Sequence, residues 1–207
     1  MKEIFPGVFK EGNKLYTIDL ISKSNSLWDP THSKLAAAIV KGLKENPIKP
    51  GLKILYLGAS TGTTISHVSD IIRKDGIVYG IEFADRVFQP LIEVSRKRKN
   101  TVPIFADARK PEKYRWVEEV DVLYVDIAQP DETEIVIRNA KEFLKNSGFL
   151  MIAIKSQSIN VTKQPKQVYE EEKKKLEDEK FDVLELIELE PYEEKHAFIM
   201  AHKRTRT

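Results

Sequence analysis

The stretch Ile54-Leu55-Tyr56-Leu57-Gly58-Ala59-Ser60-Thr61-Gly62-Thr63-Thr64 joins a short apolar run to a segment with helical periodicity. A run of this kind predicts a buried strand, and the glycines predict a sharp turn into the helix that follows. Gly58 permits the tight turn, and Gly62 permits close backbone approach at the helix start. The stretch therefore predicts an α/β fold with a ligand at the carboxyl end of this strand.

Similar units follow along the chain, because short apolar runs alternate with amphipathic segments. This alternation is typical of an open sheet with helices on both faces. The predicted strands are 53–57, 77–81, 102–105, 122–127, 149–154, 181–189 and 197–201. The predicted helices are 32–45, 63–73, 86–99, 131–145 and 166–179, with glycine stops at 75–76 and 147–148. The last two strands are expected to form an antiparallel pair at the edge of a doubly wound sheet.

The first residues have a different, turn-rich character. Apolar segments at 8–10 and 15–18 flank a turn signal at 11–14, which predicts a β-hairpin. We therefore expect two domains, a small N-terminal β domain over residues 1–31 and a larger α/β domain over residues 32–207.

Composition narrows the classes of protein. With 41% hydrophobic residues in 207, the chain has enough apolar material for a sizeable core. It has no cysteine, and its four histidines show no close pairing, so we expect no metal site. No apolar run is long enough to span a bilayer or to act as a signal peptide, which predicts a cytoplasmic protein without membrane contact. A net charge of only +2 means that any RNA binding would depend on local patches or partners.

The glycine loop favours one of two cofactor classes. Its spacing departs from the full dinucleotide fingerprint, which holds a pyrophosphate on the helix N-terminus. S-adenosylmethionine has no pyrophosphate, and its carboxylate can use the free N–H groups of Thr63 and Thr64. The loop therefore favours S-adenosylmethionine over a nicotinamide dinucleotide.

Two further strand ends support a nucleoside-containing cofactor. Glu82 ends the second predicted strand and can accept hydrogen bonds from both ribose hydroxyls, while Phe83 can pack against adenine. Asp107-Ala108, after the third strand, is placed to contact an exocyclic amine. Carboxyl ends of successive parallel strands meet at one edge of a sheet, so these residues are expected to form one site.

Four segments together resemble a known family. They are Tyr56-Leu57-Gly58-Ala59-Ser60-Thr61-Gly62-Thr63-Thr64-Ile65-Ser66-His67-Val68-Ser69-Asp70, Val78-Tyr79-Gly80-Ile81-Glu82-Phe83, Tyr124-Val125-Asp126-Ile127-Ala128-Gln129-Pro130 and Ile154-Lys155-Ser156-Gln157-Ser158. Over nearly the whole chain from Trp28 onward, the sequence resembles the fibrillarins. Because no glycine/arginine-rich extension precedes the hairpin, it is similar to the archaeal form.

The resemblance implies a Rossmann-like S-adenosylmethionine-dependent methyltransferase fold, with a seven-stranded, mostly parallel sheet, an antiparallel C-terminal strand and a small N-terminal β-hairpin domain. It implies 2′-O-methylation of ribose in rRNA and possibly tRNA, within a box C/D guide-RNA particle. The implied partners are the guide RNA, the target RNA, a Nop-domain scaffold protein and a kink-turn-binding protein.

The resemblance also implies the site residues. The implied catalytic set is Lys34, Asp126, Lys155 and His196. The implied cofactor-binding residues are Gly58, Ala59, Gly62, Thr63, Thr64, Glu82, Phe83, Asp107, Ala108, Asp126, Ile127, Ala128 and Gln129. We expect Lys155 to contact the 2′-hydroxyl and Asp126 to orient that lysine, with Lys34 and His196 holding the network. The sequence leaves open whether Lys155 is a base or a polarising donor.

Other interpretations of single residues stay open. Lys34 alone is typical of a solvated first-turn lysine, and His196 alone of an edge-strand residue. His67 is expected to be a packed histidine without a catalytic role. The basic run 96–99 either contacts phosphates or is a solvated helix end. His32 stands near a position where the family often has an arginine.

Two alternative functions also remain at this point. A small-molecule O-methyltransferase would share the sheet and Glu82, and it would be revealed by magnesium-dependent turnover. A non-catalytic cofactor-binding scaffold of an RNA particle would assemble normally after Lys155→Ala.

Overall fold

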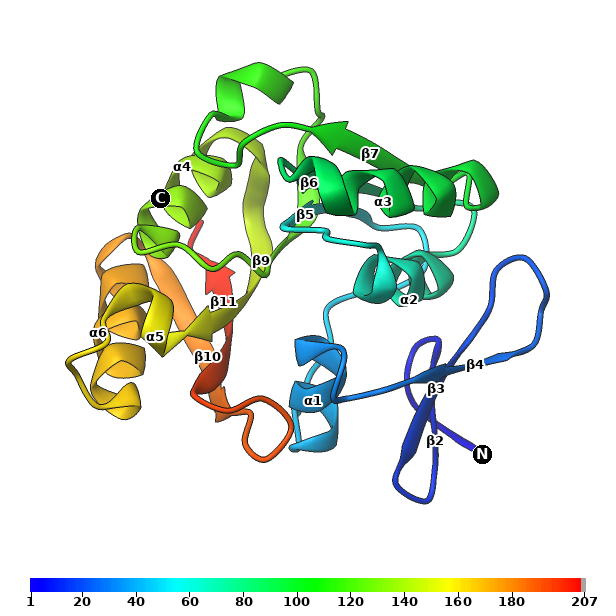
Figure 1. Cartoon of the computed structure of the whole chain (residues 1–207), viewed down its shortest axis with the longest axis horizontal. Helices are drawn as coiled ribbons and strands as arrows, with labels where there is room; N and C mark the ends of the chain where they lie inside the picture. Colours follow the sequence, from blue (N-terminus) through cyan, green and yellow to red (C-terminus); the bar gives the residue numbers. More distant parts are fainter. Residues whose placement is uncertain (206–207) are drawn as a thin grey trace.

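The predicted strand of the glycine loop, β5 (Lys53–Leu57), lies inside a seven-stranded sheet (Figure 1). The structure, a computed structural model, describes residues 1–205. The sheet order is β10-β11-β9-β8-β5-β6-β7. The other strands are β6 (Ile77–Glu82), β7 (Thr101–Phe105), β8 (Val120–Val125), β9 (Leu144–Lys155), β10 (Phe181–Glu188) and β11 (His196–Lys203).

Strands β5 to β9 pair in parallel, while β11 is antiparallel to both of its neighbours. The predicted seven-stranded sheet with an antiparallel C-terminal strand is therefore confirmed. From β5 the chain moves outward to β6 and β7, and then returns to β8 on the other side of β5. Such a reversal opens a crevice at the carboxyl ends of β5 and β8, where open α/β sheets bind ligands.

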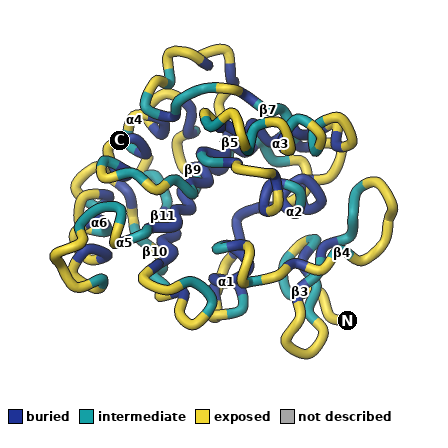
Figure 2. The backbone as a smooth tube through the Cα atoms, in the orientation of Figure 1, coloured by how far each residue is buried: buried dark blue, intermediate teal, exposed yellow. Residues whose placement is uncertain are grey.

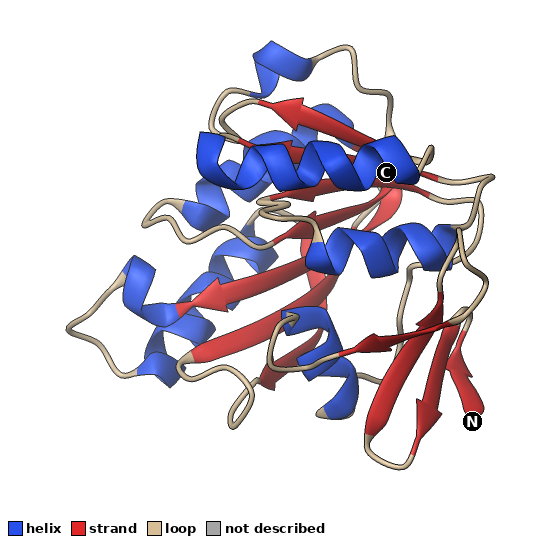
Figure 3. Ribbon diagram, turned by 45° about the vertical axis from the view of Figure 1, so that its right-hand side comes forward, coloured by secondary structure: helices blue, strands red, loops and turns tan. Residues whose placement is uncertain are grey.

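Helices cover both faces of this sheet (Figure 3). Within β5, Ile54 and Tyr56 belong to one apolar core, and Leu55 and Leu57 to the other, as strand alternation requires. The first core includes residues of α1 (Lys34–Val40), α2 (Thr63–Ile72) and α3 (Asp85–Lys97). The second includes residues of α4 (Glu132–Phe143), α6 (Pro165–Asp178) and the 3₁₀ helix η1 (Pro111–Tyr114), while the short α5 (Ser156–Ile159) contacts α6. Figure 2 shows the resulting dark blue interior along β9 and β11.

The predicted N-terminal hairpin is part of a larger antiparallel sheet. Strands β2 (Val8–Glu11) and β3 (Lys14–Ile18) form the hairpin, and β1 (Lys2–Phe5) and β4 (Asn25–Trp28) flank it. Val8, Leu15 and Trp28 are fully buried in the first core of the large sheet. The small sheet packs on α2, since β3 contacts that helix and Trp28 stacks on its His67.

Several predicted boundaries were wrong, and at three of them a residue with a positive φ is the reason. Helix α1 stops at Val40 rather than near residue 45, because Gly42 adopts a φ of 103°. Strand β9 begins directly after α4, so the turn expected at 147–148 lies inside a strand, with Ser147 at a φ of 61°. The turn after α2 takes its positive φ, 59°, at Arg73 instead of Gly76. Across residues 1–205, no helix has both the length and the apolar content needed to cross a bilayer.

Candidate functional site

The loop after β5 is held against the loop after β8 at Gly58. Gly58 adopts a φ of 82°, and a Cβ there would lie 2.2 Å from the backbone oxygen of Asp126. Gly62, at a φ of 96°, is the N-cap of α2, and a Cβ there would lie 2.8 Å from Val94 Cγ2. Both glycines are therefore required, and the closest backbone approach is at Gly58 rather than at Gly62 as expected. The contact brings Asp126 next to the glycine loop.

The Glu82 carboxylate is buried at the end of β6 and holds three backbone amides. Its Oε1 accepts from the N–H groups of Phe83 and Ala84, each at 2.9 Å, and its Oε2 accepts from Ser60 N at 2.9 Å. A carboxylate offers roughly four acceptor positions, so about one is left at Oε2. The contact with two ribose hydroxyls stays a prediction, for which these three hydrogen bonds leave about one free acceptor position on Glu82.

Two cavities open at the carboxyl edge of the sheet. The first, of about 250 Å³ and here named the Glu82 cavity, is lined by Gly58, Ser60, Ile81, Glu82, Phe83, Ala106, Asp107, Ala108, Arg109, Asp126, Ile127, Ala128, Gln129 and Ile135. The second, of about 380 Å³ and here named the Lys34 cavity, is lined by His32, Lys34, Tyr56, Gly58, Ala59, Ser60, Thr61, Thr63, Thr64 and Asp126. Gly58, Ser60 and Asp126 line both, so the two cavities meet there.

The wall of the Glu82 cavity includes an arginine that the sequence interpretation missed. Arg109 donates to the side chains of Gln129 and Asp131, the latter at 3.2 Å. Gln129 is therefore engaged by Arg109 in this structure. Phe83 is 55% exposed, which leaves its ring open to a planar ligand. The sequence could have indicated that Arg109 lines this cavity, because it follows Asp107 by two residues in the same strand-end loop.

Lys34 reaches the site because of how α1 begins. Ser33 caps α1 by accepting from Ala36 N at 3.4 Å, and it also accepts from the Thr64 hydroxyl at 3.0 Å. The first turn of α1 is thus linked to the glycine loop. From there Lys34 Nζ lies 3.1 Å from Asp126 Oδ1 and 3.3 Å from Oδ2. The alternative interpretation of Lys34, as a solvated lysine in the first turn of a helix, is therefore wrong.

The electrostatics of this pair favour a charged lysine. Burial opposes the charged form of Lys34, but the Asp126 carboxylate outweighs burial and raises the lysine pKa. Burial raises the pKa of Asp126, and the Lys34 ammonium opposes that rise. The expected pairing of Asp126 with Lys155 is replaced by a pairing with Lys34. Within the described residues, Lys155 makes no ion pair with a carboxylate.

His196 and Lys155 lie side by side at the ends of β11 and β9, as direct cross-strand partners. His196 Nδ1 lies 2.7 Å from the carbonyl oxygen of Glu194, which can only accept, so Nδ1 carries the proton and Nε2 is left as an acceptor. Burial lowers the pKa of His196, with the charge of Lys34 acting in the same direction. Neither His196 nor Lys155 lines the two cavities, although the charges of Lys34 and Asp126 act on His196.

A buried carboxyl behind Asp126 was also missed. Glu132, the first residue of α4, is 1% exposed, and both of its carboxyl oxygens lack a hydrogen-bond partner. Burial, followed by the charges of Asp126 and Glu172, raises its pKa well above the ordinary value. Its position after the loop 126–131 gave no signal of burial, because first-turn glutamates usually face solvent.

His67 has the structural role that was expected. Its ring stacks on Trp28 with centroids 4.9 Å apart, and its Nδ1 lies 2.8 Å from the Thr17 hydroxyl. Burial, followed by the charge of Arg98, lowers its pKa to about 4. His67 therefore packs as a neutral ring between the two sheets.

The chain matches known proteins both in sequence and in structure. A family model described as Fibrillarin matches residues 2–205. A fibrillarin-like rRNA/tRNA 2′-O-methyltransferase of Sulfurisphaera tokodaii is 52% identical over 201 residues, covering 97% of this chain and 85% of that protein. Fibrillarin of Aeropyrum pernix, solved with natively bound S-adenosyl-L-methionine, superposes with a TM-score of 0.84 and 45% identity, covering 91% of this chain and 88% of that one.

A structure of a fibrillarin/Nop5p complex contains a chain that superposes with a TM-score of 0.91 at 37% identity, covering 98% of this chain and all of that one. The family model spans nearly the whole sequence, and the superposed chain of the complex covers 98% of this one, so the match includes the N-terminal sheet. The chain belongs to the fibrillarin family.

Proposed function

We propose that this chain transfers a methyl group from S-adenosylmethionine to a ribose 2′-hydroxyl of rRNA, and of tRNA in some settings, as the catalytic subunit of a box C/D guide-RNA particle. The observation that carries the proposal is the Lys34–Asp126 ion pair at the point where the two cavities meet. The named activity of the relative from Sulfurisphaera tokodaii and the cofactor in the Aeropyrum pernix structure support it.

The two cavities match the two halves of the cofactor. The Glu82 cavity offers an acceptor at Glu82 Oε2 for a ribose hydroxyl, Asp107 for an amine and an open Phe83 ring for adenine. The Lys34 cavity contains the start of α2, where Thr63 and Thr64 carry first-turn N–H groups without intrahelical partners. Such groups bind a carboxylate, here that of the methionine half. The remaining cofactor residues proposed are Gly58, Ala59, Gly62, Ala108, Ile127, Ala128 and Gln129.

The chain's part in the reaction is to align an alcohol and to handle one proton. When bound, the cofactor would supply an electrophilic methyl on sulfur, and transfer of that methyl to the 2′-oxygen would release the hydroxyl proton to an acceptor of this chain. We assign the contact with the hydroxyl to Lys155, because its ammonium has no carboxylate partner here. Lys34 stays protonated and neutralises Asp126, and His196, the cross-strand partner of Lys155, offers Nε2 as the acceptor of the hydroxyl proton.

We further propose three classes of partner. A Nop-domain protein is supported by the fibrillarin/Nop5p complex, whose fibrillarin chain this one resembles over its full length. Guide RNA paired with target RNA, and a kink-turn-binding protein, complete the proposed particle. Delivery of the substrate by such partners agrees with the chain's net charge of only +2.

The test is methyl transfer from radiolabelled S-adenosylmethionine to a guide-matched RNA in a reconstituted particle. Wild type, Lys155→Ala and the exposed control Lys174→Ala are compared, and the product is mapped by resistance of one linkage to ribose-specific cleavage. We expect one labelled 2′-oxygen, with transfer lowered about 10²- to 10⁴-fold in Lys155→Ala and unchanged in the control. Folded, cofactor-binding wild type that transfers nothing would refute the enzyme and favour a scaffold. Magnesium-dependent transfer to small hydroxylated molecules would favour the other alternative.

A further inference from the structure

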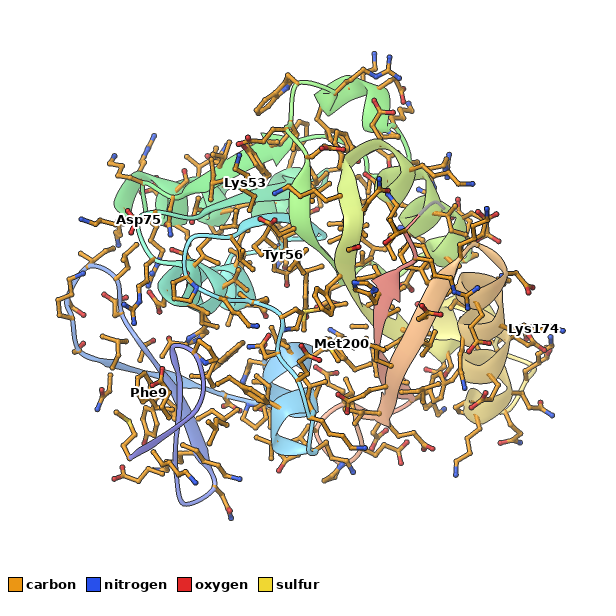
Figure 4. The ribbon with its side chains drawn as sticks, turned by 180° about the vertical axis from the view of Figure 1, so that it is seen from behind. Phe9, Lys53, Tyr56, Asp75, Lys174 and Met200 are labelled. Carbon is orange, nitrogen blue, oxygen red and sulfur yellow. The ribbon has the colours of Figure 1, made fainter. Side chains whose placement is uncertain are left out.

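A cavity of about 670 Å³ lies away from the candidate site. Its walls come from the N-terminal sheet, from the connection between β3 and β4, and from the C-terminal ends of α2 and α3. These helix ends lie at the amino edge of the large sheet, opposite the Glu82 and Lys34 cavities. In Figure 4, Phe9 of the small sheet and Asp75 after α2 lie on the same side of the molecule, and both line this cavity, here named the amino-edge groove.

The rim of the amino-edge groove is strongly basic. Lys23, Arg73, Lys74, Lys97 and Lys99 all line it, and each is exposed. In the described part of the chain none of them pairs with a carboxylate; the Lys23 ammonium donates to the Leu20 carbonyl. Three carboxylates also line the groove, those of Asp19, Asp70 and Asp75. The charges of Asp19 and Asp70 are compensated by Arg98, which pairs with both and does not itself line the groove. The charge presented to a ligand is therefore positive.

The structure separates the basic run 96–99 into different roles. Arg96 is exposed and pairs with Glu93 on its own helix. Arg98 is buried, so the expectation that the whole run contacts phosphate or solvent is wrong for this residue. Lys97 and Lys99, on either side of Arg98, both line the groove.

The groove is rigid because its two walls are tied together. Arg98 bridges Asp70 of α2 and Asp19 of the β3–β4 connection. Asp70 also accepts from the Thr17 hydroxyl and from Leu20 N, each at 2.8 Å. These bonds join the small sheet to α2 and α3, and they leave no fully buried side-chain oxygen or nitrogen of Thr17, Asp19, Asp70 or Arg98 without a partner. A preformed groove of this kind binds without a large ordering cost.

We propose that the amino-edge groove binds the phosphodiester backbone of single-stranded RNA. Phosphates contact Lys74, Lys97 and Lys99, and one unpaired base packs on the apolar wall formed by Phe9 and Ile21. The inference rests on the proposed function only in taking RNA as the polyanion that the protein meets.

The size of the groove favours RNA over an acidic protein. The groove's volume is within the range of about 300–1,000 Å³ typical of small-ligand sites, which suits one or two nucleotides. A stable protein interface needs on the order of 800 Å² from each partner, far more than such a groove supplies.

An alternative explanation of the basic rim is that helix dipoles favour cations at the C-terminal ends of α2 and α3. They account neither for Lys23, which comes from the β3–β4 connection, nor for the apolar wall.

The test measures the affinity of the full chain for a fluorescein-labelled single-stranded oligoribonucleotide across a salt series. The groove variant is Lys74→Gln/Lys97→Gln/Lys99→Gln. The matched control is Lys14→Gln/Lys44→Gln/Lys174→Gln, which removes the same charge from three exposed lysines that form no ion pair in the described chain. We expect the groove variant to bind at least about tenfold more weakly at low salt, with its salt slope reduced by about two. The control should change affinity by less than about threefold.

Equal losses in both triple variants would overturn the proposal, since they would reflect net charge alone. Unchanged RNA binding by the groove variant would also overturn it. If that variant instead lost binding to the scaffold protein, the groove would be an acidic-protein site. Methyl transfer by the wild-type particle is measured separately. Groove-dependent RNA binding without any transfer would refute the proposed function and leave the groove assignment intact.

Discussion

Two charge networks, each wholly or partly buried, lie at opposite edges of the large sheet, and they differ in how completely their hydrogen bonds are made. At the amino edge, Arg98 binds two carboxylates, and Asp70 accepts from three different groups. At the carboxyl edge, Asp126 has one cationic partner, and Glu132 has no partner for either oxygen. Both networks connect elements from distant parts of the sequence, so burial alone does not distinguish them.

The difference separates a structural network from a reactive one. A saturated buried network stabilises one arrangement, because every loss of a partner leaves an uncompensated charge. An unsaturated network costs stability, and its polar atoms stay available for a ligand. Asp126 lines both cavities of the candidate site, whereas Asp19 and Asp70 line the amino-edge groove while paired with Arg98, which lines none of the three cavities.

The largest expected effect is on the amino-edge network. Arg98→Ala leaves Asp70 and Asp19 without their cation, and breaking a buried pair costs about 3–5 kcal/mol. For a chain of this size that corresponds to a fall in Tm of roughly 10 °C. Arg96→Ala, in the same run but on the surface, should change stability by less than about 1 kcal/mol. Thermal unfolding of both variants checks this, and equal Tm values would show that the network does not hold the two sheets together.

A second prediction concerns acid. In the unfolded chain His67 has the ordinary pKa of 6.5, whereas in the folded chain burial lowers its pKa to about 4. Stability from the neutral ring is therefore present above pH 6.5 and is lost as the pH falls toward 4. The loss is up to about 3 kcal/mol. Denaturant unfolding at several pH values measures it in wild type and in His67→Gln. The variant should lose less stability over this window, and parallel curves would contradict the prediction.

The third prediction sharpens the role of the unsaturated network. Lys34→Met removes the cation from Asp126, so burial raises the pKa of that carboxyl further and favours its protonation. Methyl transfer in the reconstituted particle should fall about 100-fold, roughly 3 kcal/mol, and the midpoint of its pH profile should move upward. Single-turnover rates across pH measure both, with the exposed Lys44→Met as control. A lowered rate with an unmoved midpoint would indicate that Lys34 acts without Asp126.

The smallest effect is expected at Glu132. Its folded pKa is raised, so the wild type loses stability as the pH rises above the unfolded value of 4.5. Glu132→Gln removes this loss and should raise Tm at neutral pH by about 2–4 °C, corresponding to about 1 kcal/mol. The gain should shrink below pH 4.5. A lower Tm at neutral pH would mean that Glu132 is ionised and paired in solution.

Much of the fold followed from local patterns. The glycine loop predicted both β5 and the start of α2, because a strand, a turn and a helix each have their own periodicity. The four-stranded N-terminal sheet was only half predicted, since β1 and β4 pair through contacts that their short sequences do not reveal. The early end of α1 depended on Gly42, whose positive φ outweighed an otherwise helical pattern.

The site was less predictable than the fold. Strand ends placed Glu82 and Asp126 at one edge, as expected, but no pattern indicated which lysine would pair with Asp126. The pairing with Lys34 depends on the Ser33 cap and its bond to Thr64, which are tertiary contacts. Arg98 and Glu132 were missed because charged residues at helix ends usually face solvent.

The shared core of the two sheets has a consequence for synthesis on the ribosome. The first strands leave the ribosome before the residues they pack on, since Thr17 bonds to Asp70, 53 positions later. Trp28 likewise needs the ring of His67. Contacts between distant positions close slowly. Strands β3 and β4 therefore stay without their packing partners until α2 has been translated.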